Sequence, residues 1–156
     1  MSLSSKGLLL AVIQVALVLS VAGKYYADGT SLPRAWARAA PYDPNLPIRG
    51  RYVRLQIEVE ARGIGSLMTV RLSAEDGKLI ATAAGASGLR VRRLAGNRVA
   101  LAEPVAFFIP EHLSDPSRRA SGEELWVEVS VPKRAPPRPI RLGVKRDGVL
   151  TPLSLN

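Results

Sequence analysis

Cysteine is absent from this chain of 156 residues, and histidine occurs only once. Without cysteine the chain has no disulfides, no thiolate nucleophile and no cysteine-ligated zinc. A single histidine also excludes a metal site built from several histidines. The missing disulfides do not identify the compartment, because a chain of this length can bury a stable core without them.

Aromatic residues are scarce as well, at 5% of the chain. Proteins that bind single-stranded nucleic acid combine basic residues with stacking aromatics or carry a recognisable module. The sequence contains no such module, so we do not expect nucleic acid as the partner. The length is typical of one domain with a core of its own.

Positive charge is plentiful, with 22 lysine and arginine residues against 13 acidic residues and a net charge of +9. Only Lys6 among the basic residues lies in the apolar N-terminal segment, so the excess belongs to the rest of the chain. The electrostatic field of this positive excess attracts anionic partners. For a domain tethered to a bilayer the nearest of these is anionic lipid, and the alternative is a solvated arginine-rich surface without a ligand.

Residues 7–23 form an uncharged, mostly apolar run between two lysines. Apolar residues would occupy every face of a helix here, which argues against an amphipathic core helix and for a membrane segment. Two interpretations stay open. The run ends in the small residues that cleavage of a signal peptide after Ala22 requires, whereas its length and continuity favour a retained anchor over residues 1–24.

The orientation of this segment is indicated by two opposing signals. Lys6 precedes the run, whereas Lys24, Arg34 and Arg38 follow it, so the balance of positive charge does not favour export of the C-terminal part. The short N-terminal tail is typical of a signal-anchor, and the cleavage-like ending fits only an exported chain. We therefore expect a single-pass protein with an exported C-terminal domain.

Beyond the anchor, residues 25–41 are interpreted as a linker or first strand, and residues 42–156 as a β-rich domain. Within the first range, residues 35–40 are interpreted as a strand that places Trp36 and Arg38 on one face.

The clearest strand covers residues 52–61, where apolar and polar side chains alternate with the period of two that indicates a half-buried strand. The face expected to point to the core carries Val53, Leu55, Ile57 and Val59.

Further short strands are separated by turn residues, of which Asp76-Gly77 is a typical hairpin turn. Short antiparallel strands at close spacing predict a mainly β fold, either an antiparallel β-sandwich or a partly open β-barrel. The expected strands cover residues 67–72, 79–82, 89–94, 98–101, 105–109, 125–131, 140–145 and 149–153.

An aspartate-proline turn, Asp43-Pro44, leads into the segment Gly50-Arg51-Tyr52-Val53-Arg54-Leu55-Gln56-Ile57. This pattern resembles the signature of the GDYXXLXY family, bacterial membrane-anchored proteins named after that motif. Two positions depart from it, since Arg51 replaces the aspartate and Ile57 the final tyrosine. Residues 107–111, Phe-Phe-Ile-Pro-Glu, and the closing pair of strands also resemble that family.

The resemblance implies a single N-terminal anchor in the bacterial inner membrane, a periplasmic β-rich domain and no established activity. Because such proteins are often encoded beside polytopic membrane proteins, it also implies a membrane protein partner.

Glu111 and His112 are the only adjacent carboxylate and histidine. Neighbouring side chains on an extended segment point to opposite faces, which does not suit a catalytic pair. A serine nucleophile needs a base, and Asp43-Pro44 stands where the superficially similar turn of type I signal peptidases would need serine. The sequence therefore predicts no catalytic residue, no cofactor and no metal site.

We expect a non-enzymatic, membrane-anchored accessory protein that binds a protein or envelope component through the face around Arg51, Tyr52, Arg54 and Glu111. One alternative is a hydrolase-like envelope enzyme that uses Glu111 and His112. Another is a basic domain that binds anionic lipid or nucleic acid. The oligomeric state is left open.

Overall fold

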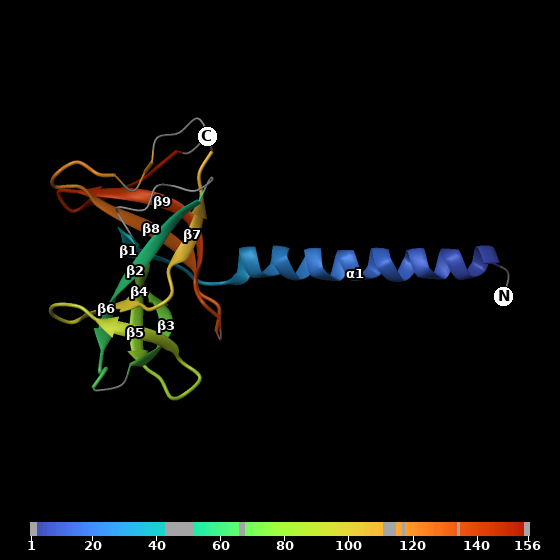
Figure 1. Cartoon of the computed structure of the whole chain (residues 1–156), viewed down its shortest axis with the longest axis horizontal. Coiled ribbons are helices and arrows are strands. Elements are labelled where there is room, and N and C mark those ends of the chain that lie inside the picture. Colours follow the sequence, from blue (N-terminus) through green and yellow to red (C-terminus); the bar gives the residue numbers. More distant parts are fainter. Residues whose placement is uncertain are drawn as a thin grey trace. The chain divides into compact units, whose positions relative to one another are not determined.

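The computed structural model describes residues 3–42, 52–65, 68–110, 115, 116, 118–133 and 135–154. Over these residues, one helix is followed by ten strands (Figure 1). The chain divides into two compact units, Met1–Leu32 and Pro33–Asn156. The elements are α1 (Leu3–Ser31), β1 (Arg34–Pro41), β2 (Tyr52–Arg62), β3 (Thr69–Glu75), β4 (Lys78–Ala83), β5 (Leu89–Arg93), β6 (Arg98–Leu101), β7 (Val105–Phe108), β8 (Glu124–Ser130), β9 (Arg138–Arg146) and β10 (Val149–Pro152).

The helix α1 contains a segment, Lys6–Ala27, that is long and apolar enough to cross a membrane. It continues to Ser31, so residues 25–31 are helical and not the linker that the sequence predicted. Gly29 weakens a helix only modestly. The first strong breaker is Pro33, which disfavours helical geometry at the residue before it, and the helix ends there.

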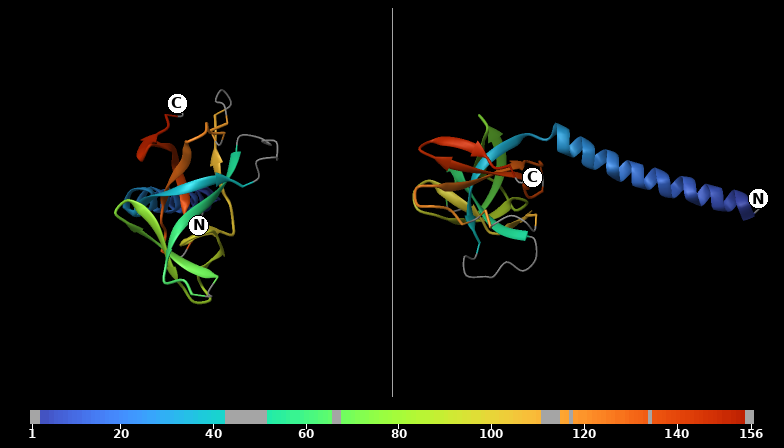
Figure 2. Two further views of the ribbon diagram at one scale, coloured as in Figure 1. Left: turned by 90° about the vertical axis from the view of Figure 1, so that its left-hand side faces the viewer. Right: turned by 90° about the horizontal axis from the view of Figure 1, so that it is seen from above.

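The second unit is built around a closed β-barrel of 6 strands, to which the remaining strands are added. The ring runs β1–β4–β3–β5–β6–β2 and closes where β1 pairs with β2. Strands β8, β9 and β10 extend the sheet from β1, and β7 pairs with β2. Figure 1 shows β8 and β9 at one end of this unit and β3, β5 and β6 at the other, and Figure 2 shows it from two further sides. The prediction of a mainly β domain after an N-terminal apolar helix is confirmed.

Strand β2 holds the two ends of the barrel unit together, because its two halves have different neighbours. Its first half pairs with β1 and β7, and its second half pairs with β4 and β6. The predicted alternation is confirmed, since the four aliphatic side chains of its inner face are at most 5% exposed. They pack with the inner faces of the other strands in one core cluster that includes Val53, Leu55, Ile57, Val59, Val127, Val129 and Leu142.

Most neighbouring strands are antiparallel, as predicted, but β4 runs parallel to both β1 and β2. These parallel contacts are short and connect residues 36 and 78, and residues 60–62 and 80–82. Parallel partners need a crossover in the chain, which alternation within one segment does not reveal. The hairpin between β3 and β4 turns at Asp76 and Gly77, whose φ angles of 49° and 72° suit the predicted turn.

The burial pattern of β2 gives a direct test of its register. Leu55 is 0% exposed whereas the adjacent Arg54 is exposed on the outer face. We expect Leu55→Ala to lower the free energy of unfolding by about 2–5 kcal/mol, because it leaves a cavity in the core. Arg54→Ala is expected to change it by no more than about 0.5 kcal/mol. Urea denaturation followed by circular dichroism measures both, and equal effects would contradict this register.

Candidate functional site

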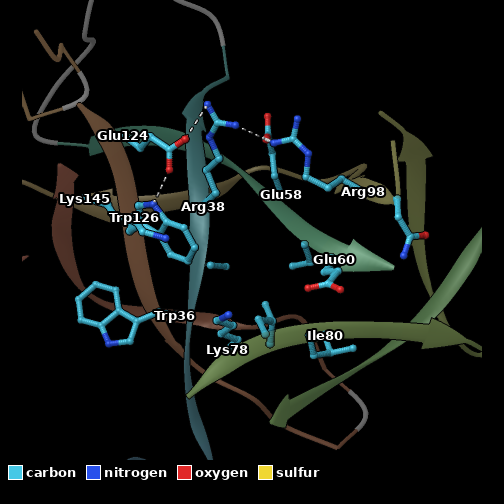
Figure 3. Close-up of a pocket in the computed structure, with 14 residues that line it drawn as sticks. Trp36, Arg38, Glu58, Glu60, Lys78, Ile80, Arg98, Glu124, Trp126 and Lys145 are labelled. Carbon is cyan, nitrogen blue, oxygen red and sulfur yellow. Dashed lines mark hydrogen bonds and ion pairs between the residues drawn. The ribbon is translucent and has the colours of Figure 1, made fainter. Parts of the chain in front are cut away.

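A groove of about 380 Å³ opens on the outer surface of the barrel where three strands meet (Figure 3). Its floor and near walls are residues 36–38 of β1, 58–60 of β2 and 78–80 of β4. Asn97 and Arg98 line one further side, and Glu124, Trp126 and Lys145 line another. We refer to this hollow as the junction groove.

The junction groove results from the way in which the three strands separate. β1 pairs with β2 at Arg38 and Glu58, and with β4 at Trp36 and Lys78. β2 in turn leaves β1 and pairs with β4 from Glu60 onward. The middle residue of each triplet, Ala37, Val59 or Leu79, is buried in the core. The residues before and after each of these three lie toward the outer surface. Their side chains separate and leave a shallow apolar floor between the strands.

Both tryptophans of the chain lie along the same wall of this groove. In the β1–β8 pair, Trp36 stands opposite Glu128 and Trp126 stands opposite Arg38, so the two indoles are diagonal neighbours on the outer face. The Lys145 ammonium lies 4.7 Å from the centre of the Trp126 ring. Cations over indole rings are stabilised by the negative ring face.

Trp36 is placed by Gly143 of β9 and by Arg141 on the same strand. A Cβ atom on Gly143 would lie 2.8 Å from Cζ3 of Trp36 and 3.1 Å from the carbonyl oxygen of Thr151. Only glycine leaves room for the indole at this point. The Arg141 guanidinium lies 5.5 Å from the centre of the Trp36 ring, and its Nε donates a hydrogen bond to Glu128 at 2.5 Å.

The upper rim of the groove in Figure 3 is a chain of charged side chains. Arg38 lies between Glu124 at 3.5 Å and Glu58 at 3.9 Å, and Arg98 reaches Glu58 at 3.2 Å. The Trp126 indole N–H donates to Glu124 at 3.1 Å, which connects the rim to the aromatic wall. These pairs are partly exposed, and each such pair contributes only about 0.2–1 kcal/mol to stability. Their main effect is to hold the rim in one arrangement.

The face predicted from the sequence is found at the other end of β2. Tyr52 is 57% exposed, and its ring meets that of Phe108 edge to face at a centroid distance of 5.6 Å. Arg54 lies exposed on the same outer face, opposite Ala106 of β7. The structure therefore brings Tyr52 and Arg54 together and adds Phe108, 47% exposed, which sequence reasoning did not select.

Arg51 and Glu111, the other two members of that predicted face, lie outside the described residues, as does His112. The hydrolase alternative that depends on Glu111 and His112 stays a prediction. Among the residues that are described, no three histidine, cysteine, aspartate or glutamate side chains gather in one place.

The residues of the junction groove were missed because β1, β2, β4 and β8 are far apart in the sequence. Lys78 and Trp126 reach the groove only through the β1–β4 and β1–β8 pairings. One signal was available, since both tryptophans occupy outward positions of predicted strands, where a large ring has no core to enter. The lining combines an apolar floor, two indoles and charges of both signs, which suits binding of a small polar ligand.

Comparisons with models of protein families, with curated proteins and with solved structures find no match to this chain.

Gly143 tests how the aromatic wall is held. We expect Gly143→Ala to displace the Trp36 ring, to lower the free energy of unfolding by about 1–3 kcal/mol through overpacking, and to shift the tryptophan emission spectrum. Gly85→Ala is the matched control, because a Cβ atom there meets nothing within 4 Å. Urea denaturation and fluorescence measure both variants. An unchanged emission spectrum in Gly143→Ala would contradict the placement of Trp36.

Proposed function

We propose that this protein is a non-enzymatic accessory protein, anchored in the bacterial inner membrane by α1, with its barrel unit on the periplasmic side and a polytopic membrane protein as its partner. The observation that carries the proposal is the apolar segment Lys6–Ala27 of 22 residues. At 1.5 Å per residue it measures about 33 Å, which matches a hydrocarbon core of about 30 Å.

The continuity of α1 supports a retained anchor. The small residues that precede a cleavage site after Ala22 lie within the helix, which continues for nine residues to Ser31. Exposed loop tips are the preferred sites of proteolytic nicking, whereas Ala22 lies in regular helix. Two residues, Leu32 and Pro33, then separate α1 from β1, so the anchor and the barrel are joined by a very short connection.

Gln14 supports a partner within the membrane. It lies near the middle of the apolar segment, and its amide forms no hydrogen bond among the described residues. An amide in hydrocarbon is unfavourable unless it has a partner, and helix–helix hydrogen bonds supply one. Gly7 and Ala11 precede Gln14 at helical spacing, and small residues of this kind allow two helices to approach closely.

The exposed aromatic pair on the barrel supplies a second contact surface. Tyr52 and Phe108 stand together on the outer face of β2 and β7, next to Arg54. Tyrosine, phenylalanine and arginine are enriched in protein interfaces. The resemblance of residues 50–57 to the GDYXXLXY signature supports the same assignment, because Tyr52 matches the first of its two tyrosines.

Gln14→Leu tests the membrane contact. We expect recovery of the partner to fall about 3- to 30-fold when the full-length protein is purified from crosslinked membranes, since one helix–helix hydrogen bond contributes roughly 0.6–2 kcal/mol. Ser20→Ala is the matched control, because the Ser20 hydroxyl already donates to the Leu17 carbonyl oxygen at 2.8 Å. Full recovery with Gln14→Leu would argue against a contact through this face.

Tyr52→Ala tests the contact on the barrel. We expect it to reduce recovery of the same partner at least tenfold while the free energy of unfolding falls by only about 0.5–1.5 kcal/mol, the contribution of one aromatic pair. Met68→Ala is the control, since Met68 is 47% exposed and precedes β3 in another part of the unit. Equal recovery with Tyr52→Ala and Met68→Ala would reject the aromatic pair as a contact.

A further inference from the structure

We infer that the junction groove is a binding site for an acidic sugar, whose ring lies against the tryptophan wall and whose carboxylate faces Lys78. This inference goes beyond the proposed function, because it needs neither the membrane partner nor the Tyr52 face. It depends on the shape of the groove, its hydrogen-bonding groups and its charge.

The tryptophan wall suits a sugar ring. A pyranose has a face of C–H bonds that packs against an indole and an edge of hydroxyl groups that needs hydrogen bonds. Trp126 is fixed by its hydrogen bond to Glu124, and Trp36 is fixed by the close approach of Gly143. Two indoles held in place lose little conformational freedom on binding, which favours affinity. The volume, about 380 Å³, is at the small end of the range of about 300–1,000 Å³ that ligand pockets span.

The remaining lining offers donors and acceptors together. Glu60 supplies a carboxylate, Asn97 an amide and Arg98 a guanidinium, and all three border the apolar floor. A hydroxyl group both donates and accepts a hydrogen bond, so a polyhydroxylated ring uses such a mixed set fully. A purely apolar ligand would leave these groups without partners on binding, at a cost in affinity.

The charges favour an acidic ligand. Arg38 and Arg98 are already paired with Glu58 and Glu124 on the rim. Lys78 and Lys145, in contrast, form no ion pair among the described residues. Figure 3 shows Lys78 between Trp36 and Ile80, on the side of the groove opposite the charged rim. Within the described residues, the lining thus has two ammonium groups without an ion pair and one carboxylate without an ion pair, that of Glu60. The excess of one positive charge matches one ligand carboxylate.

The sheet pairing argues against an extended peptide as the ligand. Peptides that bind sheets usually add a strand to a free edge. At the groove, β1 is paired on one side with β8 and on the other with β2 and β4. β2 is likewise paired on both sides, with β4 and with β6. The groove therefore offers side chains and not main-chain hydrogen bonds.

The two tryptophans provide the measurement, because both line the groove. We titrate the purified full-length protein in detergent with galacturonic acid, which carries one carboxylate, and, as the neutral match, with galactose, and follow tryptophan fluorescence. We expect a saturable change with the acid and binding at least threefold weaker for the neutral sugar. Lys78→Gln is expected to weaken binding of the acid about two- to fivefold, the effect of one exposed ion pair, and to leave the neutral sugar unchanged.

Lys133→Gln is the charge-matched control, since Lys133 is exposed in the loop after β8 and does not line the groove. Three results would overturn the inference: no saturable change with the acid, equal binding of the acid and the neutral sugar, or equal loss with Lys78→Gln and Lys133→Gln. A glutamate tetrapeptide that binds the groove more tightly than the acid would replace the sugar with a peptide ligand. None of these results alters recovery of the membrane partner, so this inference and the proposed function can fail separately.

Discussion

The meeting of β1, β2 and β4 is the constraint on which the rest of the barrel unit depends. β2 changes its neighbour along one side, since it pairs with β1 up to Glu58 and with β4 from Glu60. The pairing of β1 with β2 closes the barrel, and the passage of β2 from β1 to β4 separates the outer side chains of the three strands. The core residues Ala37, Val59 and Leu79 seal the inside of the same point. Closure of the barrel and opening of the groove are thus two effects of one geometry.

Local pattern predicted the strands well but not their neighbours. Alternation in residues 52–61 marks Leu55 and Ile57 as core residues because burial of every second side chain is a property of the segment itself. No single segment of the sequence indicates that β4 runs parallel to its neighbours, or that Trp126 lies beside β1. Both depend on pairing between strands that are far apart in the chain. The helix extends beyond its expected end for a similar reason, since the apolar run marks where the chain is hydrophobic and not where helical geometry stops. Of the candidate site, Tyr52 and Arg54 could be found from their outward register, whereas Lys78 required the topology.

The outer surface of β2 joins two areas of different chemistry. At one end, Tyr52 presents an aromatic edge with a nearby arginine, a combination suited to another protein. At the other end, Glu58 and Glu60 border a groove with fixed indoles and paired charges, which suits a small polar molecule. The spacing of two along the strand places all of these side chains on one face. A single strand therefore gives the barrel unit two distinct surfaces without any need for a mobile loop between them.

The pairing of β1 with β8 also sets the order in which the domain can be completed. Residues 34–38 of β1 stand opposite residues 130–126 of β8. The first strand after the helix therefore completes its pairing only when one of the last strands has formed. Hairpins such as β3–β4 close short loops and form at low entropic cost. The β1–β8 contact closes a loop that contains most of the second unit, at a higher entropic cost. A chain delivered from its N-terminus keeps one edge of β1 open until β8 has followed. Completion of the fold is thereby delayed until nearly all of the second unit is present.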